Sequence, residues 1–245
     1  MSSPLSGIIN FHKPIGITSA KAVYNVRAVT HQRKSGHAGT LDPGASGVLV
    51  LCLGRATKWV EEVMDQPKWY RATARLDVVS ESHDSDRPLT PISVAREPSP
   101  EELREALRTF EGRIMQTPPR ISAIKIGGAP AYRRERGDEP FVLEPRPVTI
   151  HWIHLRQYVF PRLEFEMCCG RGTYVRSLIR DVGAKLQTGG CLDSLARLCV
   201  GPFSLDQSVT LDMIQQSSPE DYVIELDRAV AMLDPSARVI PPRPG

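Results

Sequence analysis

Asp42 is the residue whose type differs most from its surroundings in this sequence. It is the first acidic residue, after a lead of 41 residues that contains Lys13, Lys21, Arg27, Arg33 and Lys34. A single carboxylate can act as a nucleophile or as a general base. The same residue also opens the tripeptide Asp-Pro-Gly, in which each residue type favours a tight turn. On this tripeptide alone, a plain turn is the simpler interpretation.

Other residue patterns that could support chemistry are weaker. The stretch "GHAGT" at 36 to 40 resembles a phosphate-binding glycine loop, but it lacks the lysine of a P-loop and the glycine order of a dinucleotide site. His151 and His154 lie three apart in a strand-like stretch, where their side chains point to opposite faces. Five cysteines without a paired C-x-x-C spacing indicate reduced, buried thiols. We therefore assign no metal.

The distribution of charge is more informative than its sum. A net charge of +3 does not by itself indicate a nucleic-acid partner. However, the segment 113–136 contains six lysines and arginines and one glutamate, and the lead before Asp42 is also basic. One such run is usually a solvated surface, whereas two favour a polyanionic partner. No apolar run approaches the roughly 20 residues of a membrane helix, and no signal peptide is recognisable, so we expect a cytoplasmic protein.

The elements that must position Asp42 follow from the apolar pattern. Residues 18–29 predict a helix with a Thr18/Ser19 cap. The continuous apolar run 48–53 suits a central strand buried on both faces, although periodicity alone also fits a short helix. A helical stripe follows at 55–65. Residues 68–79 alternate with period two, which directs Tyr70 inward.

The second half of the chain also mixes helices and strands. The proline-rich stretch 80–100 predicts an exposed excursion, and Ser99 with Glu102 forms the capping box of the next helix. Residues 146–169 predict two strands joined by a turn, followed by a glycine loop and a helix capped by Thr173. After Ser208 we expect one or two short helices. Because strands and helices do not alternate regularly, the fold class is α+β rather than doubly wound α/β.

Six motifs together resemble one family, the TruB-type tRNA pseudouridine synthases. They occur in the family's order across nearly the whole chain, and the second is long and specific: "KPIGITS" at 13–19, "GHAGTLDPGASGVLVLCLGRATK" at 36–58, "KWYRATARL" at 68–76, "PPRISAIKIGGAPAYRRERG" at 118–137, "GRGTYVRSLIRDVG" at 170–183 and "LARL" at 195–198. The resemblance implies a mixed, largely antiparallel sheet flanked by helices, with an RNA-binding insertion. It also implies isomerisation of uridine 55 in the tRNA T-loop, without a cofactor, after the base is flipped out.

The resemblance assigns roles to individual residues. Asp42 matches the catalytic aspartate, Arg176 the arginine that pairs with it, and Tyr70 the tyrosine that stacks on the flipped uracil. Without the resemblance, Arg176 would be a helix-surface arginine and Tyr70 an ordinary core residue. The remaining matches are pocket or RNA contacts and the lysine of the first motif: His37, Tyr174, Leu195 and Lys13.

The same comparison suggests the organisation of the chain. We expect a catalytic domain over 1–208, a basic insertion over about 113–142 that grips RNA through Arg133, Arg134 and Arg136, and a short extension over 209–245 without a PUA domain. The expected partner is the tRNA T-arm, bound by a monomer without an obligate protein partner. A noncatalytic RNA-binding or tRNA-folding protein of the same fold is the alternative, and the complete set of Asp42, Tyr70 and Arg176 favours the enzyme.

Overall fold

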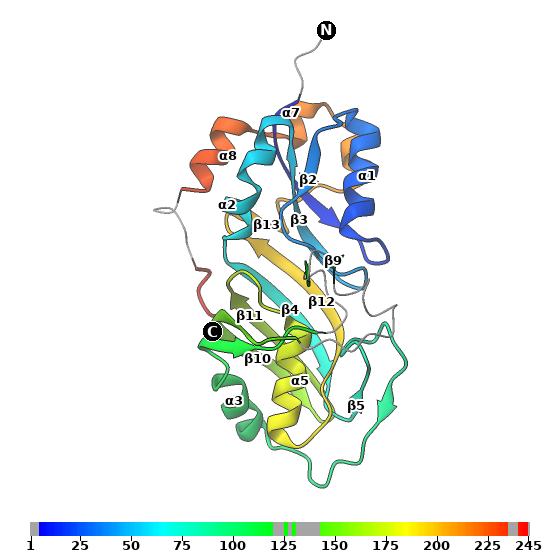
Figure 1. Cartoon of the computed structure of the whole chain (residues 1–245), viewed down its shortest axis with the longest axis vertical. Helices are drawn as coiled ribbons and strands as arrows, with labels where there is room; N and C mark the ends of the chain where they lie inside the picture. The colour runs from blue at the N-terminus through cyan, green and yellow to red at the C-terminus, as the bar shows by residue number, and fades with distance from the viewer. Residues whose placement is uncertain (1–4, 120–124, 127–128, 131–142, 235–239, 245) are drawn as a thin grey trace. The chain divides into compact units, whose positions relative to one another are not determined.

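The computed structural model describes residues 5–119, 125–126, 129–130, 143–234 and 240–244. The chain forms two compact units. Unit 1 contains Met1–Tyr70 and Leu195–Pro242, and unit 2 contains Arg71–Ser194 with Arg243–Gly245. Strands β4 (Lys68–Arg75) and β12 (Cys191–Val200) carry the chain from one unit into the other (Figure 1). Unit 1 is therefore assembled from two segments that are far apart in the sequence.

The sheet of unit 1 has the strand order β14-β1-β3-β12. Strands β14, β1 and β2 make antiparallel pairings, whereas β12 runs parallel to β3 and places Arg197 opposite Gly47. The strands are β1 (Gly7–Lys13), β2 (Ser35–His37), β3 (Ser46–Leu53), β13 (Phe203–Ser204), which pairs with β12, and β14 (Ile224–Glu225). The helices are α1 (Ser19–Thr30), the 3-10 helix η1 (Gly54–Trp59), α2 (Val60–Met64), α6 (Leu211–Gln216), α7 (Pro219–Tyr222) and α8 (Leu226–Met232).

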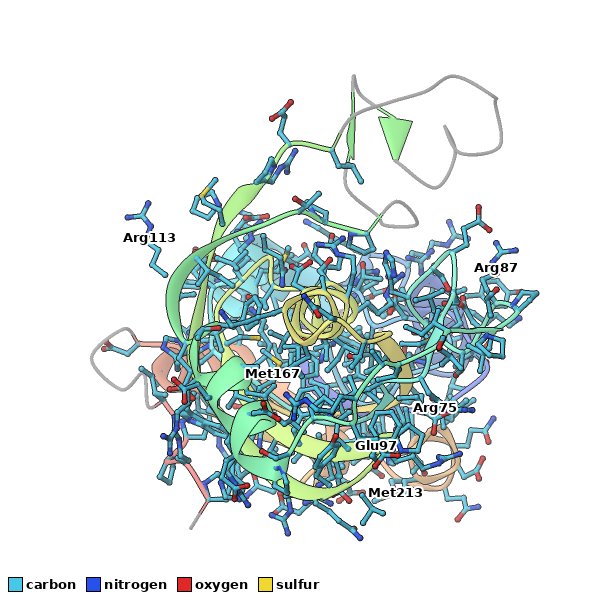
Figure 2. All side chains as sticks on the ribbon, turned by 90° about the horizontal axis from the view of Figure 1, so that it is seen from below. Arg75, Arg87, Glu97, Arg113, Met167 and Met213 are labelled. Carbon is cyan, nitrogen blue, oxygen red and sulfur yellow. The ribbon has the colours of Figure 1, made fainter. Side chains whose placement is uncertain are left out.

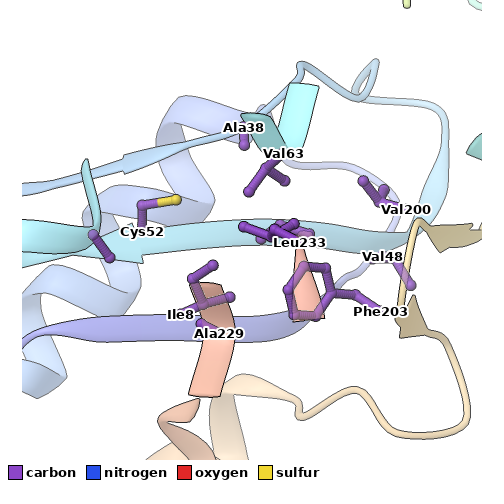
Figure 3. Close-up of a cluster of buried hydrophobic side chains, with 11 residues drawn as sticks. Ile8, Ala38, Val48, Cys52, Val63, Val200, Phe203, Ala229 and Leu233 are labelled. Atoms are coloured by element: carbon purple, nitrogen blue, oxygen red, sulfur yellow. The ribbon is translucent and has the colours of Figure 1, made fainter. Parts of the chain in front are cut away.

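The core of unit 1 surrounds β3, in which seven consecutive residues from Gly47 onward are buried. Apolar side chains from β1, β3, α2 and α8 pack into one cluster, seen in Figure 3. The run 48–53 is thus the buried strand that its composition indicated, and not a short helix. The Thr18 cap of α1 is also confirmed, since its side chain accepts a hydrogen bond from the Lys21 N–H.

The C-terminal part of the chain differs from the expectation. In the part of the chain after Ser208 that the structure describes, there are three short helices instead of one or two, and β14 pairs with β1. Ala229 and Leu233, which follow the expected boundary at 208, lie in the core cluster of unit 1, and the expected domain bounds stay a prediction. The helices are too short for their apolar residues to form a recognisable stripe, because one or two buried residues per helix carry no periodicity.

In unit 2 the sheet has the strand order β12-β4-β11-β10-β7. Of β12 and β4, only the residues within Arg71–Ser194 belong to this unit. Figure 1 shows α3 (Pro100–Arg108) beside α5 (Val175–Leu186), and the two helices are in contact. The Ser99 capping box of α3 is present as predicted. The other strands are β5 (Val78–Val79), β6 (Thr90–Pro91), β7 (Gly112–Gln116), β8 (Lys125–Ile126), β9 (Ala129–Pro130), β10 (Arg146–Val159) and β11 (Arg162–Cys169).

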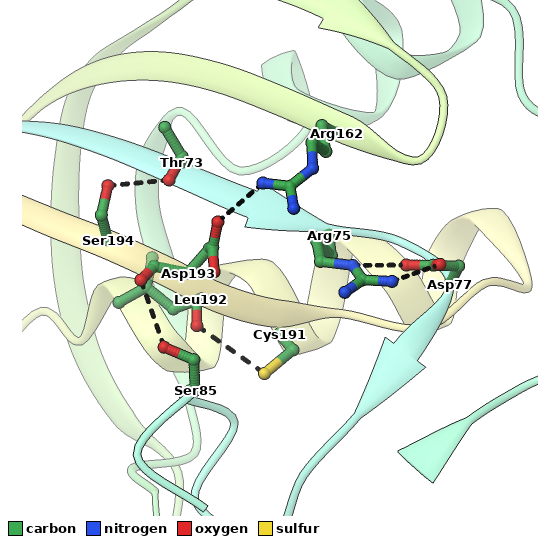
Figure 4. Close-up of polar contacts among 9 residues, drawn as sticks. All are labelled: Thr73, Arg75, Asp77, Ser85, Arg162, Cys191, Leu192, Asp193 and Ser194. Atoms are coloured by element: carbon green, nitrogen blue, oxygen red, sulfur yellow. Dashed lines mark hydrogen bonds and ion pairs between the residues drawn. The ribbon is translucent and has the colours of Figure 1, made fainter. Parts of the chain in front are cut away.

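Ion pairs between polar side chains lie at the surface of unit 2. In Figure 4, Arg75 pairs with Asp77 and Arg162 with Asp193, at 2.7 and 3.0 Å between nitrogen and oxygen. Figure 2 shows Arg113 extending away from the unit's interior, where Met167 lies. The α+β class is confirmed: β1 pairs with β3, β10 with β11 and β10 with β7 in antiparallel fashion, whereas β12 pairs with β3 in parallel.

Two local expectations for unit 2 are wrong. Tyr174 rather than Thr173 occupies the N-cap position of α5, and its side chain makes no cap hydrogen bond; the Thr173 hydroxyl instead donates to the Gly170 carbonyl at 3.2 Å. The start of the expected excursion is only partly exposed, since Ser80 and Ser82 are buried whereas Glu81 between them is exposed. The Ser80 hydroxyl donates to the Asp84 carbonyl at 2.8 Å. Serines that bond to their own loop can be buried without an apolar signal in the sequence.

Candidate active site

Asp42 lies in the loop between β2 and β3 of unit 1, where it is half-buried. Its backbone carbonyl accepts a hydrogen bond from the Ala45 N–H at 3.1 Å, which closes a turn over Pro43 and Gly44. The turn suggested by the tripeptide is therefore real. It does not compete with a catalytic role, because the turn uses the backbone of Asp42 and leaves its carboxylate to other interactions.

Buried polar groups hold the backbone on both sides of Asp42. The Lys13 side chain is fully buried, and its ammonium donates to the carbonyls of Pro14, Ile17 and Pro43 at 2.8, 2.9 and 3.5 Å. Ser19 accepts from the Leu41 N–H and donates to the Leu41 carbonyl, both at 2.9 Å. The geometry thus supports a structural role for Lys13, and the substrate contact that the family match also allows stays a prediction.

The charges near this loop are coupled. Burial lowers the pKa of Lys13 to about 8; the Asp42 carboxylate opposes this change, and the Arg197 guanidinium adds to it. Burial, and secondarily Arg197, also lowers the pKa of His37. Among the described residues, His37 Nδ1 is buried without a hydrogen-bond partner. Both effects favour the neutral imidazole of His37, and its contact with RNA stays a prediction.

Arg197 is a site residue that the sequence analysis did not single out. Its side chain is only 1% exposed, and its guanidinium donates to the carbonyls of Val48, Thr40 and Gly39 at 2.7, 3.4 and 3.2 Å. The motif "LARL" contains it, but a strand over 191–200 was not predicted. An arginine between apolar residues was the available signal, because a charged side chain in such a position needs buried partners.

Tyr70 and Leu195 belong to unit 1 as well. Tyr70 is buried in β4, whose alternating burial matches the predicted period of two. Leu195 is half-buried and precedes Ala196, which pairs with Ser46 at the start of β3. The register therefore places Leu195 near the end of the Asp42 loop. Contacts of these two side chains with a substrate stay predictions.

In unit 2, Arg176 occupies the first turn of α5 and is 5% exposed. Its guanidinium donates to the Ser82 carbonyl at 3.3 Å. The surface-arginine interpretation is therefore wrong. Because Asp42 and Arg176 belong to different units, their pairing stays a prediction.

Gln116 fixes the backbone at the start of α5. Its amide oxygen accepts from the Tyr174 N–H at 2.9 Å, and its amide nitrogen donates to the Tyr174 carbonyl at 3.2 Å. Tyr174 itself is half-buried, in agreement with a pocket-lining position. Gln116 was not recognised from the sequence, since nothing local distinguishes it from an ordinary strand glutamine.

Several expectations concern other parts of the chain. Arg133, Arg134 and Arg136 lie outside the described residues. Within the described residues, no group of three or more potential ligands is placed to bind a metal, and the five cysteines are buried. No helix in the described part of the chain has the length and apolarity that crossing a membrane requires.

The fold has solved relatives. The chain superposes on a chain of the "Crystal Structure of a Cbf5-Nop10-Gar1 Complex" with a TM-score of 0.71 and 26% identity, covering 92% of this chain and 62% of that one. A second match is the "Crystal structure of the archaeal box H/ACA sRNP Nop10-Cbf5 complex", with a TM-score of 0.64 and 27% identity, covering 86% and 53% of the two chains.

The sequence comparisons define the class as pseudouridylate synthase. The model of the "TruB family pseudouridylate synthase (N terminal domain)" matches residues 27–175. "tRNA pseudouridine synthase B" of Syntrophus aciditrophicus is 40% identical over 232 residues, which cover 94% of this chain and 73% of the relative. The protein of the same name from Bordetella avium is 39% identical over 240 residues, covering 95% and 97%. The chain belongs to the TruB family.

Proposed function

We propose that this pseudouridylate synthase acts on tRNA and isomerises uridine 55 of the T-loop, with Asp42 as the catalytic carboxylate. The names of its relatives support the substrate. The observation that carries the role of Asp42 is the construction of its loop. Buried Lys13, Ser19 and Arg197 fix the backbone around one half-buried carboxylate, which is the preorganisation that a catalytic group requires.

The reaction conserves all atoms of the nucleotide. The bond between N1 of uracil and C1′ of ribose breaks, the base turns, and C5 bonds to C1′. The proton leaves C5 and N1 gains one, so no oxidant or reductant is consumed. Asp42 can attack the sugar, attack the base or remove a sugar proton, and each role requires the ionised carboxylate.

The other site residues assist this carboxylate in the proposal. Arg176 pairs with Asp42 and keeps it ionised, because a guanidinium favours the charged form of a nearby acid. Tyr70 stacks on the flipped uracil, and Tyr174 and Leu195 line the base pocket. His37 contacts the RNA next to the flipped base. The burial of Tyr70 and Arg176 supports positions in a pocket rather than on an open surface.

The proposal extends to partners and location. The protein acts as a monomer in the cytoplasm, without an obligate protein partner, and recognises the T-arm. The basic residues of the lead and of segment 113–136 contact phosphates, since Lys and Arg supply the sequence-independent part of RNA affinity.

The test uses the purified chain alone with an unmodified tRNA transcript. Pseudouridine is mapped by chemical modification and reverse transcription. We expect modification at uridine 55, and none in a control transcript with cytidine at that position. If the protein binds the transcript but forms no pseudouridine, the noncatalytic alternative replaces the proposed enzyme.

A further inference from the structure

We propose that Arg197 is a positioning residue for the reaction: its guanidinium fixes both ends of the loop 39–48 and thereby aims the Asp42 carboxylate. This inference rests on the proposed catalytic role of Asp42. It assigns to a buried side chain of β12 a part in catalysis that does not involve contact with the RNA.

The hydrogen bonds of Arg197 connect the two ends of this loop. At the entry, its two Nη atoms donate to the carbonyls of Thr40 and Gly39, at 3.4 and 3.2 Å. At the exit, its Nε donates to the carbonyl of Val48 at 2.7 Å. Asp42 lies between these points. A planar guanidinium has five donors in fixed directions, so one side chain can hold both strands of the loop at a set separation.

The backbone fixes the position of Arg197 itself. Arg197 pairs with Gly47 in the parallel register of β12 and β3. A Cβ atom built on Gly47 would lie 2.2 Å from the Arg197 carbonyl oxygen, and Gly47 has a φ of +107°. Only glycine permits this approach. The guanidinium therefore extends from a backbone that lies directly against the exit of the Asp42 loop.

A purely structural residue would not need a charge at this position. Burying a guanidinium is costly unless each donor is satisfied, and a hydrophobic side chain of similar volume is often at least as stabilising. The hydrogen bonds that the structure gives Arg197 all end on backbone carbonyls of the loop and of β3. Its charge also acts on both Lys13 and His37, so its positive potential extends over the surroundings of Asp42.

The test compares Arg197→Ala, Arg197→Lys and Asp42→Asn with wild type. Single-turnover pseudouridine formation, RNA dissociation constant and melting temperature are measured, and guanidinium is added at concentrations too low to unfold the protein. Arg75→Ala is the matched arginine control, since Arg75 pairs with Asp77 on unit 2. We expect Arg197→Ala to bind RNA within about threefold of wild type and to react about 100-fold more slowly, as a misplaced catalytic group does.

Added guanidinium should increase the single-turnover rate of Arg197→Ala by at least about tenfold. It should not increase the rate of Asp42→Asn. A rate within threefold of wild type, or a loss that follows RNA affinity or melting temperature without rescue, would overturn the positioning role. If Arg197→Ala does not fold, Arg197→Lys decides: slow reaction with normal RNA binding supports the proposal, and a wild-type rate refutes it. An active Asp42→Asn would instead reject the proposed catalytic residue.

Discussion

At the scale of single residues, the site combines one half-buried carboxylate with three buried polar side chains that bond to the backbone of neighbouring residues in its loop: Lys13, Ser19 and Arg197. The sequence predicted Asp42, Tyr70 and Arg176 through motifs, and the structure shows the last two to be buried. The sequence did not predict the roles of Arg197 and Gln116. Their partners are backbone carbonyls and amides at distant positions; an arginine between apolar residues indicates that Arg197 needs buried partners, but the sequence does not show which ones they are.

Arg176→Lys tests the need for a guanidinium in the first turn of α5. The variant keeps the charge but loses the planar donor pair, so we expect the single-turnover rate to fall about 100-fold while RNA affinity changes little. Arg162→Lys is the control, because Arg162 pairs with Asp193 at the surface and should tolerate the change. Equal rates for both variants would contradict a special role of Arg176.

His37 predicts a defined loss of stability in acid. Burial lowers its pKa in the folded protein below the ordinary value of 6.5, so the unfolded state binds the proton first. Stability is therefore lost as the pH falls from 6.5 through the lower folded pKa. Chemical unfolding of wild type and His37→Gln over this range should give a smaller loss for the variant. His83 and His151 change in the same direction and supply a background common to both proteins. If the difference in the free energy of unfolding between wild type and His37→Gln were the same at every pH in this range, the lowered pKa of His37 would be refuted.

At the scale of elements, the sequence predicted those helices and strands correctly whose pattern lies within their own residues. The capping box of α3, the alternation of β4 and the apolar run of β3 are each visible within a dozen residues. The loop 80–86 and strand β12 were not predicted correctly, because both depend on partners elsewhere. Leu192, for example, bridges to Asp84 across more than a hundred residues of sequence.

Gly47→Ala tests the close backbone approach between the paired strands β12 and β3. The new methyl group would meet the Arg197 backbone at 2.2 Å from a residue with positive φ. We expect the free energy of unfolding to fall by about 3 kcal/mol or more. Gly36→Ala is the control, because the structure places nothing within 4 Å of its Cβ position. A melting temperature of Gly47→Ala equal to that of Gly36→Ala would show that the strands separate easily.

At the scale of the whole molecule, the motifs predicted the family and the α+β class, but not the assembly of the units. Unit 1 combines Met1–Tyr70 with Leu195–Pro242. A pattern read along the chain does not show that Leu233 packs in the same cluster as Ile8. Long-range contacts of this kind are set by tertiary packing, about which local propensity carries no information.

The basic segment gives a prediction about RNA binding as a whole. Replacing Arg133, Arg134 and Arg136 together with glutamine should weaken affinity for tRNA and for an isolated T-arm hairpin alike. The slope of log affinity against log salt should decrease in magnitude by about two to three, as expected for three lost phosphate contacts. Dissociation constants over a salt series measure this slope. The same slope in the triple variant and wild type would place the RNA on another surface.

The most direct test of the account is the Asp42→Asn variant. The amide is nearly isosteric with the carboxylate but can act neither as nucleophile nor as base. With wild-type protein as the reference, the measurement is single-turnover pseudouridine formation in tRNA together with the dissociation constant. We predict RNA binding within about threefold of wild type and a rate lower by at least about a thousandfold. A rate within about tenfold of wild type would contradict the assignment of Asp42 as the catalytic carboxylate.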